Sequence, residues 1–276
     1  MQKSGNHQLE VLAVHAFEDN YIWLIHDGTS GIVVDPGDPD AVIRVLDERR
    51  LHLAAILVTH HHGDHIAGIP SLAARFRCDV FGPAKEDIAG LTHKVKANDV
   101  IRIAQAGLEL HVLEIPGHTL GHLAYHCEQR QWLFPGDTLF AAGCGRLFEG
   151  SSDQMHRSLQ KLMALPDTTQ VFCAHEYTLS NLAFALEADP ENPDIPHRLL
   201  VEKAKRRQGL PTIPTTIGWE RRTNPFVRAS EASVVRNIVL RRRPANIEPP
   251  AIFAALRSWK DEFRSHPNPT PDIAYE

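Results

Sequence analysis

The first 175 residues alternate short apolar runs with turns rich in Gly, Pro and Asp. Short runs of apolar and β-branched residues bounded by such turns are typical of strands. The pattern predicts strands over residues 9–17, 21–26, 31–35, 53–59, 79–81, 100–103, 108–115, 122–127, 131–134 and 170–174. Helical spacing predicts helices over residues 39–50, 66–76 and 153–165, the first of them capped by Asp38 with Pro39 at its first position.

After about residue 176 the pattern becomes helical. Helices are predicted over residues 179–187, 197–208, 231–241 and 250–264, with proline-rich connectors at 189–196 and 210–225. Many strands, some paired as hairpins and others separated by helices, favour α/β layers around mixed sheets. The sequence therefore predicts an α/β domain over residues 1–175 and a smaller all-α C-terminal domain over residues 176–276.

The composition is that of an ordinary globular protein, with 43% hydrophobic and 23% charged residues. No apolar run approaches the length that spans a bilayer, and the polar N-terminus lacks the apolar core of a signal peptide. We therefore expect a cytoplasmic protein that does not associate with membranes. The four cysteines occur singly, which indicates neither a disulfide framework nor a structural zinc site.

The net charge of −5 is unevenly distributed. Residues 1–175 carry a charge of −7 and residues 176–276 a charge of +2. An acidic first part suits cation binding, and a slightly basic second part suits an anionic small molecule. The second part is too weakly basic to indicate nucleic acid, and no obligate protein partner is evident.

The segment Thr59-His60-His61-His62-Gly63-Asp64-His65 directly follows the predicted strand at 53–59. If the extended backbone continues, His60 and His62 point to one side and His61 to the other, and a turn at Gly63 can bring Asp64 and His65 to a neighbouring position. A single histidine is usually a surface group or a satisfied core group. Four imidazoles and a carboxylate within six residues serve no packing purpose, and they are standard ligands of zinc, iron or manganese.

Three further candidates each follow an apolar run: His118, Asp137 and His175. Each alone has an ordinary reading, because an Asp can cap a helix and a His can stabilise a turn. Together they repeat one arrangement, in which a strand presents a metal ligand at its end. Cys144 lies between two glycines, which favours a tight loop over a catalytic thiol.

The motifs THHHGDH, PGHTLGH, FPGDTLF and AHEYT resemble those of the metallo-β-lactamase fold superfamily. Further segments narrow the resemblance to the glyoxalase II family: Asp19-Asn20-Tyr21, AGCGRLFEG, HEYTLSNLAFA, NPFVR and LRSWKDEF. The resemblance covers nearly the whole chain. It implies an αββα sandwich followed by a helical substrate-binding domain.

The resemblance also implies a ligand set for two divalent metal ions, with zinc preferred and iron or manganese compatible. The first ion would be held by His60, His62 and His118, the second by Asp64, His65 and His175, and Asp137 would bridge both. Substrate-binding positions fall on Arg146, Tyr177, Arg257 and Lys260. Two departures stand out, Phe148 where some members have a tyrosine and Gly63 where a bulkier residue is common.

The implied activity is thioester hydrolysis of S-2-hydroxyacylglutathiones, the second step of methylglyoxal detoxification, which converts S-D-lactoylglutathione to D-lactate and glutathione. We expect a metal-bridging hydroxide to attack the thioester carbonyl, with Asp64 and Asp137 as the catalytic residues that hold the ions and orient the hydroxide. The alternatives are another thioester hydrolase of the superfamily and a non-catalytic metal-binding module. A β-lactamase, a persulfide dioxygenase and an RNA nuclease fit less well, because the signal peptide and the basic arm are absent and the second-site ligands are present.

Overall fold

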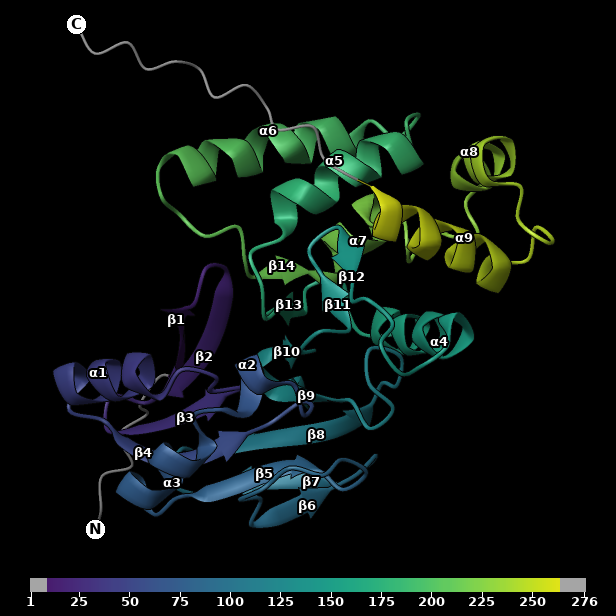
Figure 1. Ribbon diagram of the computed structural model, residues 1–276. Helices are drawn as coiled ribbons and strands as arrows, with labels where there is room; N and C mark the ends of the chain where they lie inside the picture. The colour runs from purple at the N-terminus through teal and green to yellow at the C-terminus, as the bar shows by residue number, and fades with distance from the viewer. Residues whose placement is uncertain (1–8, 264–276) are drawn as a thin grey trace, which may run out of the picture.

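A computed structural model of the chain describes residues 9–263. Two six-stranded sheets stack on one another, and a helical region lies above them (Figure 1). The outermost residues of both predicted domains, 1–8 and 264–276, lie outside the described residues. No helix of residues 9–263 is both long enough and apolar enough to cross a membrane.

The first sheet has the strand order β1-β2-β3-β4-β5-β6. Its strands are β1 (Glu10–Ala16), β2 (Asn20–His26), β3 (Ser30–Val34), β4 (His52–Leu57), β5 (Asp79–Pro83) and β6 (His93–Val95). The pairs β1-β2 and β2-β3 are antiparallel, and the pairs from β3 to β6 are parallel. This mixture confirms the mixed sheet predicted from the sequence, although the three-residue strand β6 was not predicted.

The second sheet has the order β14-β13-β10-β9-β8-β7. Its strands are β7 (Val100–Ile103), β8 (Leu108–Glu114), β9 (Leu123–Cys127), β10 (Trp132–Phe134), β13 (Gln170–Val171) and β14 (Thr215–Thr216). A separate hairpin, β11 (Leu139–Phe140) with β12 (Gly143–Cys144), projects toward the helical region (Figure 1). A single-turn helix, Glu128–Arg130, joins β9 to β10.

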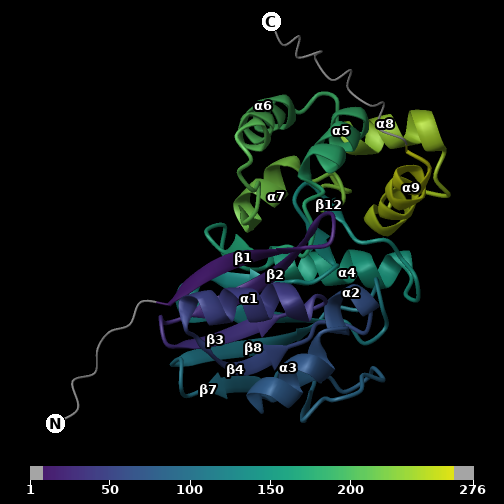
Figure 2. The ribbon, with the colours of Figure 1, turned by 60° about the vertical axis from the view of Figure 1, so that its left-hand side comes forward.

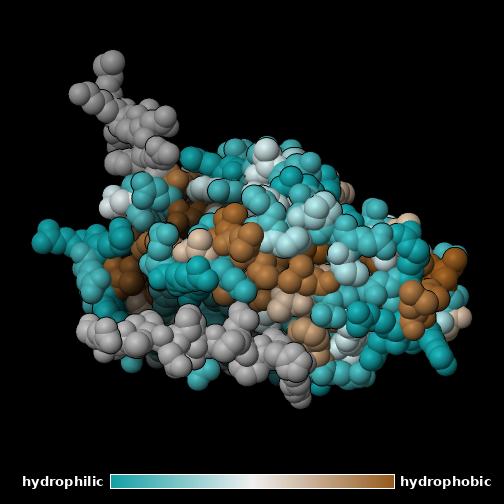
Figure 3. Space-filling model, turned by 90° about the horizontal axis from the view of Figure 1, so that it is seen from above, coloured by the Kyte–Doolittle hydropathy of each residue, from teal (hydrophilic) through white to brown (hydrophobic). Residues whose placement is uncertain are grey.

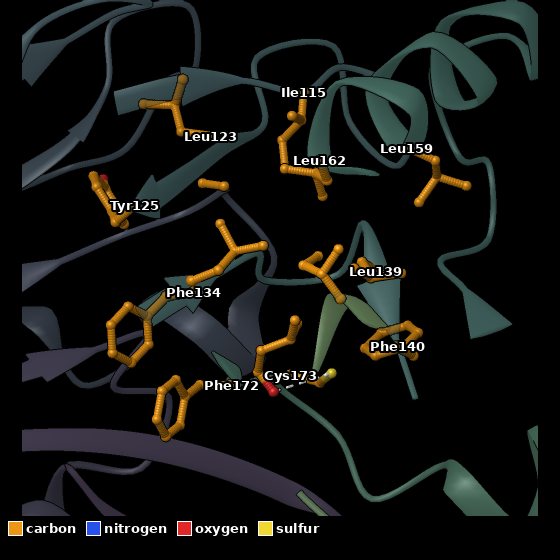
Figure 4. Close-up of a cluster of buried hydrophobic side chains, with 14 of the residues drawn as sticks. Ile115, Leu123, Tyr125, Phe134, Leu139, Phe140, Leu159, Leu162, Phe172 and Cys173 are labelled. Atoms are coloured by element: carbon orange, nitrogen blue, oxygen red, sulfur yellow. Dashed lines mark hydrogen bonds between the residues drawn. The ribbon is translucent and has the colours of Figure 1, made fainter. Parts of the chain in front are cut away.

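Alternating side chains of the first sheet separate two hydrophobic layers. Ile25, Ile32 and Leu57 face the second sheet, whereas Leu24 and Val33 face the helices α1 (Pro39–Arg49) and α3 (Ile69–Phe76). Figure 2 shows α1 and α3 against the first sheet. Figure 4 shows the inner core, where the rings of Phe134 and Phe172 stack with centroids 5.0 Å apart, and where α4 (Ser152–Met163) contributes Leu159 and Leu162.

Local signals place the helix ends. Asp38 accepts hydrogen bonds from the backbone N–H groups of Asp40 and Ala41, which caps α1 as the sequence predicted. The helix expected over 66–76 is instead divided into α2 (Gly63–Ile66) and α3. The division falls at Gly68, whose N–H donates to the Pro36 carbonyl and where a Cβ would lie 2.3 Å from that oxygen.

The helical region contains α5 (Thr178–Ala188), α6 (Asp194–Arg207), α7 (Ile217–Thr223), α8 (Ala232–Arg242) and α9 (Pro249–Glu262). The prediction of a proline-rich connector over residues 210–225 is wrong, because this segment contains both β14 and α7. Since β14 pairs with β13, the helical region also completes the second sheet. Figure 3 views the molecule from this side, where a band of hydrophobic side chains runs between hydrophilic ones.

Candidate metal centre

The seven predicted ligands come from four separate segments and meet at one end of the two sheets. His60 and His62 lie in the loop after β4, and Asp64 and His65 lie in α2. His118 follows β8, Asp137 follows β10, and His175 follows β13. The described residues contain three groups whose ligand atoms lie within 4.8 Å of one another, and every member of these groups is one of the predicted ligands. Such a His/Asp cluster can bind divalent metal.

His60, His62 and His118 form a group of three imidazoles. The Nε2 of His60 lies 3.1 Å from the Nδ1 of His62, and the Nε2 of His118 lies 2.9 Å from the same atom. Burial lowers the pKa of each of these three histidines. They are therefore neutral at physiological pH, which is the form that binds a metal ion.

Asp64, His65 and His175 form the second group. The Oδ2 of Asp64 lies 3.4 Å from the Nε2 of His65 and 3.5 Å from the Nε2 of His175. Asn20 donates a 2.9 Å hydrogen bond to that carboxylate oxygen, which fixes its direction.

Asp137 lies between the two groups. Its Oδ2 is 3.5 Å from the Nε2 of His118 in the first group, and its Oδ1 is 3.4 Å from the Nε2 of His175 in the second. Burial would raise the pKa of Asp137, but the neighbouring histidines, His65 above all, hold it well below its ordinary value. The carboxylate is therefore ionised, with one oxygen near each group.

Two buried atoms at the centre of the cluster lack hydrogen-bond partners among the described residues. These are the Oδ1 of Asp137 and the Nε2 of His65, which lie 3.5 Å apart. Unpaired buried polar atoms are costly in a folded protein. A divalent cation bound by both atoms would satisfy them, so the donor set fits a metal ion.

The far side of several of the predicted ligand rings is held by a hydrogen bond, as is usual for metal-binding histidines. The Nδ1 of His118 lies 2.7 Å from the carbonyl oxygen of Arg146, and the Nδ1 of His175 lies 2.8 Å from the Oδ1 of Asp19. The Nδ1 of His60 lies 3.0 Å from the hydroxyl of Thr59. These contacts direct the opposite nitrogen of each ring toward the cluster.

Sequence reasoning missed His122 and Asp35 as parts of the site. His122 is fully buried, stacks on His60 with centroids 4.6 Å apart, and accepts a 3.2 Å hydrogen bond from the backbone N–H of Asp137. Asp35 accepts hydrogen bonds from both the N–H and the hydroxyl of Thr59. The motif PGHTLGH contains His122, whereas no local signal distinguishes Asp35 from a turn residue.

Two of the four predicted substrate-binding residues lie beside the cluster. The ring of Tyr177 stacks on His175, and its side chain is partly exposed. Arg146 is exposed, its guanidinium lies 5.6 Å from the ring centre of Phe148, and Phe148 contacts the rings of His62 and His118 edge-on.

The other two lie on α9, one helical turn apart. Arg257 is buried, and it donates hydrogen bonds to the carbonyl oxygen of Cys144 and to Asp261. Its side chain therefore supports the loop that leads to Arg146. Lys260 is partly buried, with its Nζ 3.4 Å from the carbonyl oxygen of Ser180 and 5.5 Å from the ring centre of Phe184.

An open cavity of about 540 Å³ adjoins the cluster on the side of Asp64. It is lined by the β1–β2 turn, with Phe17 and Asp19, and by α2, with Gly63 at its start and Ala67 directly after its end. A Cβ added at Gly63 would meet no atom within 4 Å, so there is open space beside this residue at the entrance of the cavity.

Comparison with known proteins identifies the families that this chain matches. Residues 16–175 match the Metallo-beta-lactamase superfamily, and residues 176–263 match the family described as Hydroxyacylglutathione hydrolase C-terminus. Among solved structures, ETHE1 from Myxococcus xanthus has a TM-score of 0.61 at 24% identity, covering 92% of this chain and 98% of that one. The BLEG-1 B3 metallo-beta-lactamase has a TM-score of 0.60 at 22% identity, covering 80% and 99%. These likenesses show the fold.

Curated relatives named "Hydroxyacylglutathione hydrolase" match at much higher identity. The protein of Nitrosomonas eutropha is 45% identical over 93% of this chain and 100% of its own length. The protein of Aliivibrio salmonicida is 49% identical over 92% and 100%. The chain therefore belongs to the hydroxyacylglutathione hydrolase family, within the metallo-β-lactamase superfamily.

Proposed function

We propose that this protein hydrolyses S-2-hydroxyacylglutathione thioesters, converting S-D-lactoylglutathione to D-lactate and glutathione in the second step of methylglyoxal detoxification. The observation that carries the proposal is the position of Asp137, between a group of three imidazoles and a second group of one carboxylate and two imidazoles. The near full-length identity to relatives named for this activity supports the same conclusion.

The cluster would hold two divalent ions, zinc by preference, with iron and manganese compatible with the same ligands. His60, His62 and His118 would bind one ion, and Asp64, His65 and His175 would bind the other. When bound, a pair of such ions lowers the pKa of water toward neutrality and polarises a carbonyl group.

Asp64 and Asp137 are the proposed catalytic residues. Asp64 is the more exposed of the two, with 40% of its side chain accessible against 11% for Asp137. Burial would raise the pKa of Asp64, but His65 and Asn20 hold it below its ordinary value. Its carboxylate is therefore ionised at the edge of the cluster, where Asn20 orients it.

The peptide part of the substrate would bind toward the helical region. Glutathione carries two carboxylates, for which Arg146, beside Phe148, and Lys260, beside Ser180, supply cations. Arg257 was predicted to contact glutathione, and its hydrogen bonds to the 143–145 loop support a positioning role. A thiol with a pKa of about 8.5 leaves as a thiolate with little help from a general acid.

The remaining parts of the proposal follow from the same arrangement. Residues 1–175 would form the catalytic domain and residues 176–276 the glutathione-binding domain. We propose a cytoplasmic enzyme with a small-molecule substrate, without nucleic acid, membrane or obligate protein partners.

The test is thiol release from S-D-lactoylglutathione, followed with a thiol reagent, together with metal quantification on the same sample. Nitrocefin and RNA serve as alternative substrates. Hydrolysis of the thioester, with no hydrolysis of nitrocefin or RNA, would support the proposal. Bound metal without thioester hydrolysis would instead indicate a metal-binding module without this activity.

A further inference from the structure

Glu86 is a buried carboxylate that lies outside the proposed ligand set. It belongs to the loop between β5 and β6, and only 7% of the residue is exposed. Its Oε1 accepts a hydrogen bond from the buried hydroxyl of Thr119, and its Oε2 lies 3.0 Å from the Nδ1 of His61. Burying a carboxylate costs free energy unless it is paired and hydrogen-bonded. Both partners of Glu86 adjoin proposed metal ligands in the sequence.

The second nitrogen of His61 extends this contact. Its Nε2 lies 3.2 Å from the Oε1 of Glu149, and the Oε2 of Glu149 accepts a 2.9 Å hydrogen bond from the backbone N–H of Leu120. We call the set of His61, Glu86, Glu149 and Thr119 the His61 clamp. The clamp joins the residue between His60 and His62 to the two residues that follow His118.

The close approach of Glu86 to the His118 loop is built into the sequence. A Cβ at Gly121 would lie 2.4 Å from the Cγ of Glu86. Glycine at this position therefore gives the carboxylate the room to reach Thr119.

We propose that Glu86 is a positioning residue that acts through His61 and Thr119 to align the three-imidazole group for cation binding. His62 and His118 come from loops far apart in the sequence, yet their ring nitrogens lie 2.9 Å apart. Besides this ring contact, the clamp is a second side-chain link between the two loops. This inference rests on the proposed metal-binding role of the cluster.

The test measures cation affinity, with Zn²⁺ added to metal-free protein in competition with a chromogenic chelator. We expect Glu86→Ala to weaken one of the two sites by roughly 10–100-fold, the usual effect of removing an outer partner of a metal ligand. Glu86→Gln should retain most of the affinity, because its carbonyl accepts from Thr119 and its amide donates to His61. The matched control is Glu109→Ala, a carboxylate that pairs with Arg102 on β7 and His111 on β8.

A double-mutant cycle assigns the effect to the three-imidazole group. In a His118→Ala background, which already disrupts that group, Glu86→Ala should cause no further loss of cation affinity. The absorption spectrum of the Co²⁺-loaded protein and the melting temperature of the metal-free protein are recorded in parallel. We expect an altered Co²⁺ spectrum and a nearly unchanged melting temperature in Glu86→Ala.

The inference is overturned if Glu86→Ala binds both cations as tightly as the parent protein. It is also overturned if Glu86→Ala weakens both sites equally and lowers the melting temperature of the metal-free protein, which would indicate a general loss of stability. Finally, it is overturned if Glu86→Ala still lowers the cation affinity in the His118→Ala background. A parent protein that binds no cation would refute this inference and the metal centre together. A parent that binds cations without hydrolysing the thioester would refute only the proposed activity, because the affinity measurements stand on their own.

Discussion

The ring of Tyr177 lies face to face on the imidazole of His175, with centroids 4.8 Å apart and planes inclined by 7°. Phe140 contacts both rings edge-on, at 5.7 Å from His175 and 5.3 Å from Tyr177. The wall of the proposed substrate site is therefore packed directly on a proposed metal ligand. Changes at Tyr177 can affect either the hydroxyl group or the ring, and the two effects are separable.

We expect Tyr177→Ala to raise the KM for S-D-lactoylglutathione by about 2- to 12-fold, the equivalent of an aromatic pair worth about 0.5–1.5 kcal/mol. Tyr177→Phe keeps the stacked ring and should raise KM less. Metal content should be unchanged in both variants, because Asp19 still holds the Nδ1 of His175. Equal KM increases in the two variants would assign the effect to the hydroxyl instead of the ring.

Asp137→Asn replaces the central carboxylate by a neutral amide of the same shape. The change removes the charge that offsets the bound cations, so we predict a loss of metal and a fall in kcat of about 100-fold or more, beyond the effect of losing an outer partner. Metal quantification and thioester turnover on the same preparation check this. Asp167→Asn, at an exposed carboxylate that pairs with Arg221, is the matched control. Unchanged metal content in Asp137→Asn would refute the bridging assignment.

The lowered pKa of Lys260 leads us to predict that substrate binding depends on pH. Burial, with a contribution from Arg257, lowers the pKa of Lys260 to about 8. The ammonium group is therefore charged below pH 8 and loses its charge as the pH rises, so kcat/KM for an anionic substrate should fall above about pH 8.

Lys260→Ala should remove this alkaline limb and raise KM more than it lowers kcat, because a remote binding contact is lost. Lys94→Ala, at an exposed position on β6, should leave the profile unchanged. If Lys260→Ala lowered kcat alone and kept the limb, the lysine would not be a binding contact.

The candidate ligands could be recognised in the sequence because the His60–His65 segment and each later candidate follow an apolar run, whereas their division between two ions came from the family resemblance. A strand fixes where its end lies, so His118, Asp137 and His175 were expected near the His60–His65 segment, and the structure brings them together. Even the opposite orientations of His61 and His62 follow from side-chain alternation, since His61 faces Glu86 while His62 faces His60.

The contacts that depend on tertiary packing could not be predicted. The seven-residue helix α7 is too short for its hydrophobic period to stand out, and its place is set by Glu220, which is fully buried and bonds Arg198 and the N–H of Ala142. The family resemblance placed Arg257 among the substrate-binding residues, and nothing in the sequence showed that its side chain is buried. Its burial becomes visible only when α9 packs beside the 143–145 loop.

The buried pair of Arg198 and Glu220 yields a stability prediction. The two side chains lie 2.9 Å apart and are 2% and 0% exposed. Arg198→Ala leaves the Glu220 carboxylate buried without its cation, and we expect a loss of about 3–5 kcal/mol in the free energy of unfolding. Chemical denaturation measures it, with Arg236→Ala, which breaks the exposed pair with Glu191, as the control. A loss below about 1 kcal/mol for Arg198→Ala would show that the buried charge finds another partner.

Gly63 and Gly68 frame the short helix of the metal loop and should respond in opposite ways to the same substitution. Gly63 has an ordinary backbone conformation and open space where a Cβ would lie, so Gly63→Ala should stabilise the protein by about 0.4–1 kcal/mol by restricting the unfolded chain. At Gly68 the Cβ would meet the backbone oxygen of Pro36 at 2.3 Å, and neither backbone can yield without moving the loop. Gly68→Ala should therefore cost about 1–3 kcal/mol, as overpacking typically does. Denaturation of the metal-free variants checks the pair, and a destabilised Gly63→Ala would mean that the loop needs the freedom of glycine there.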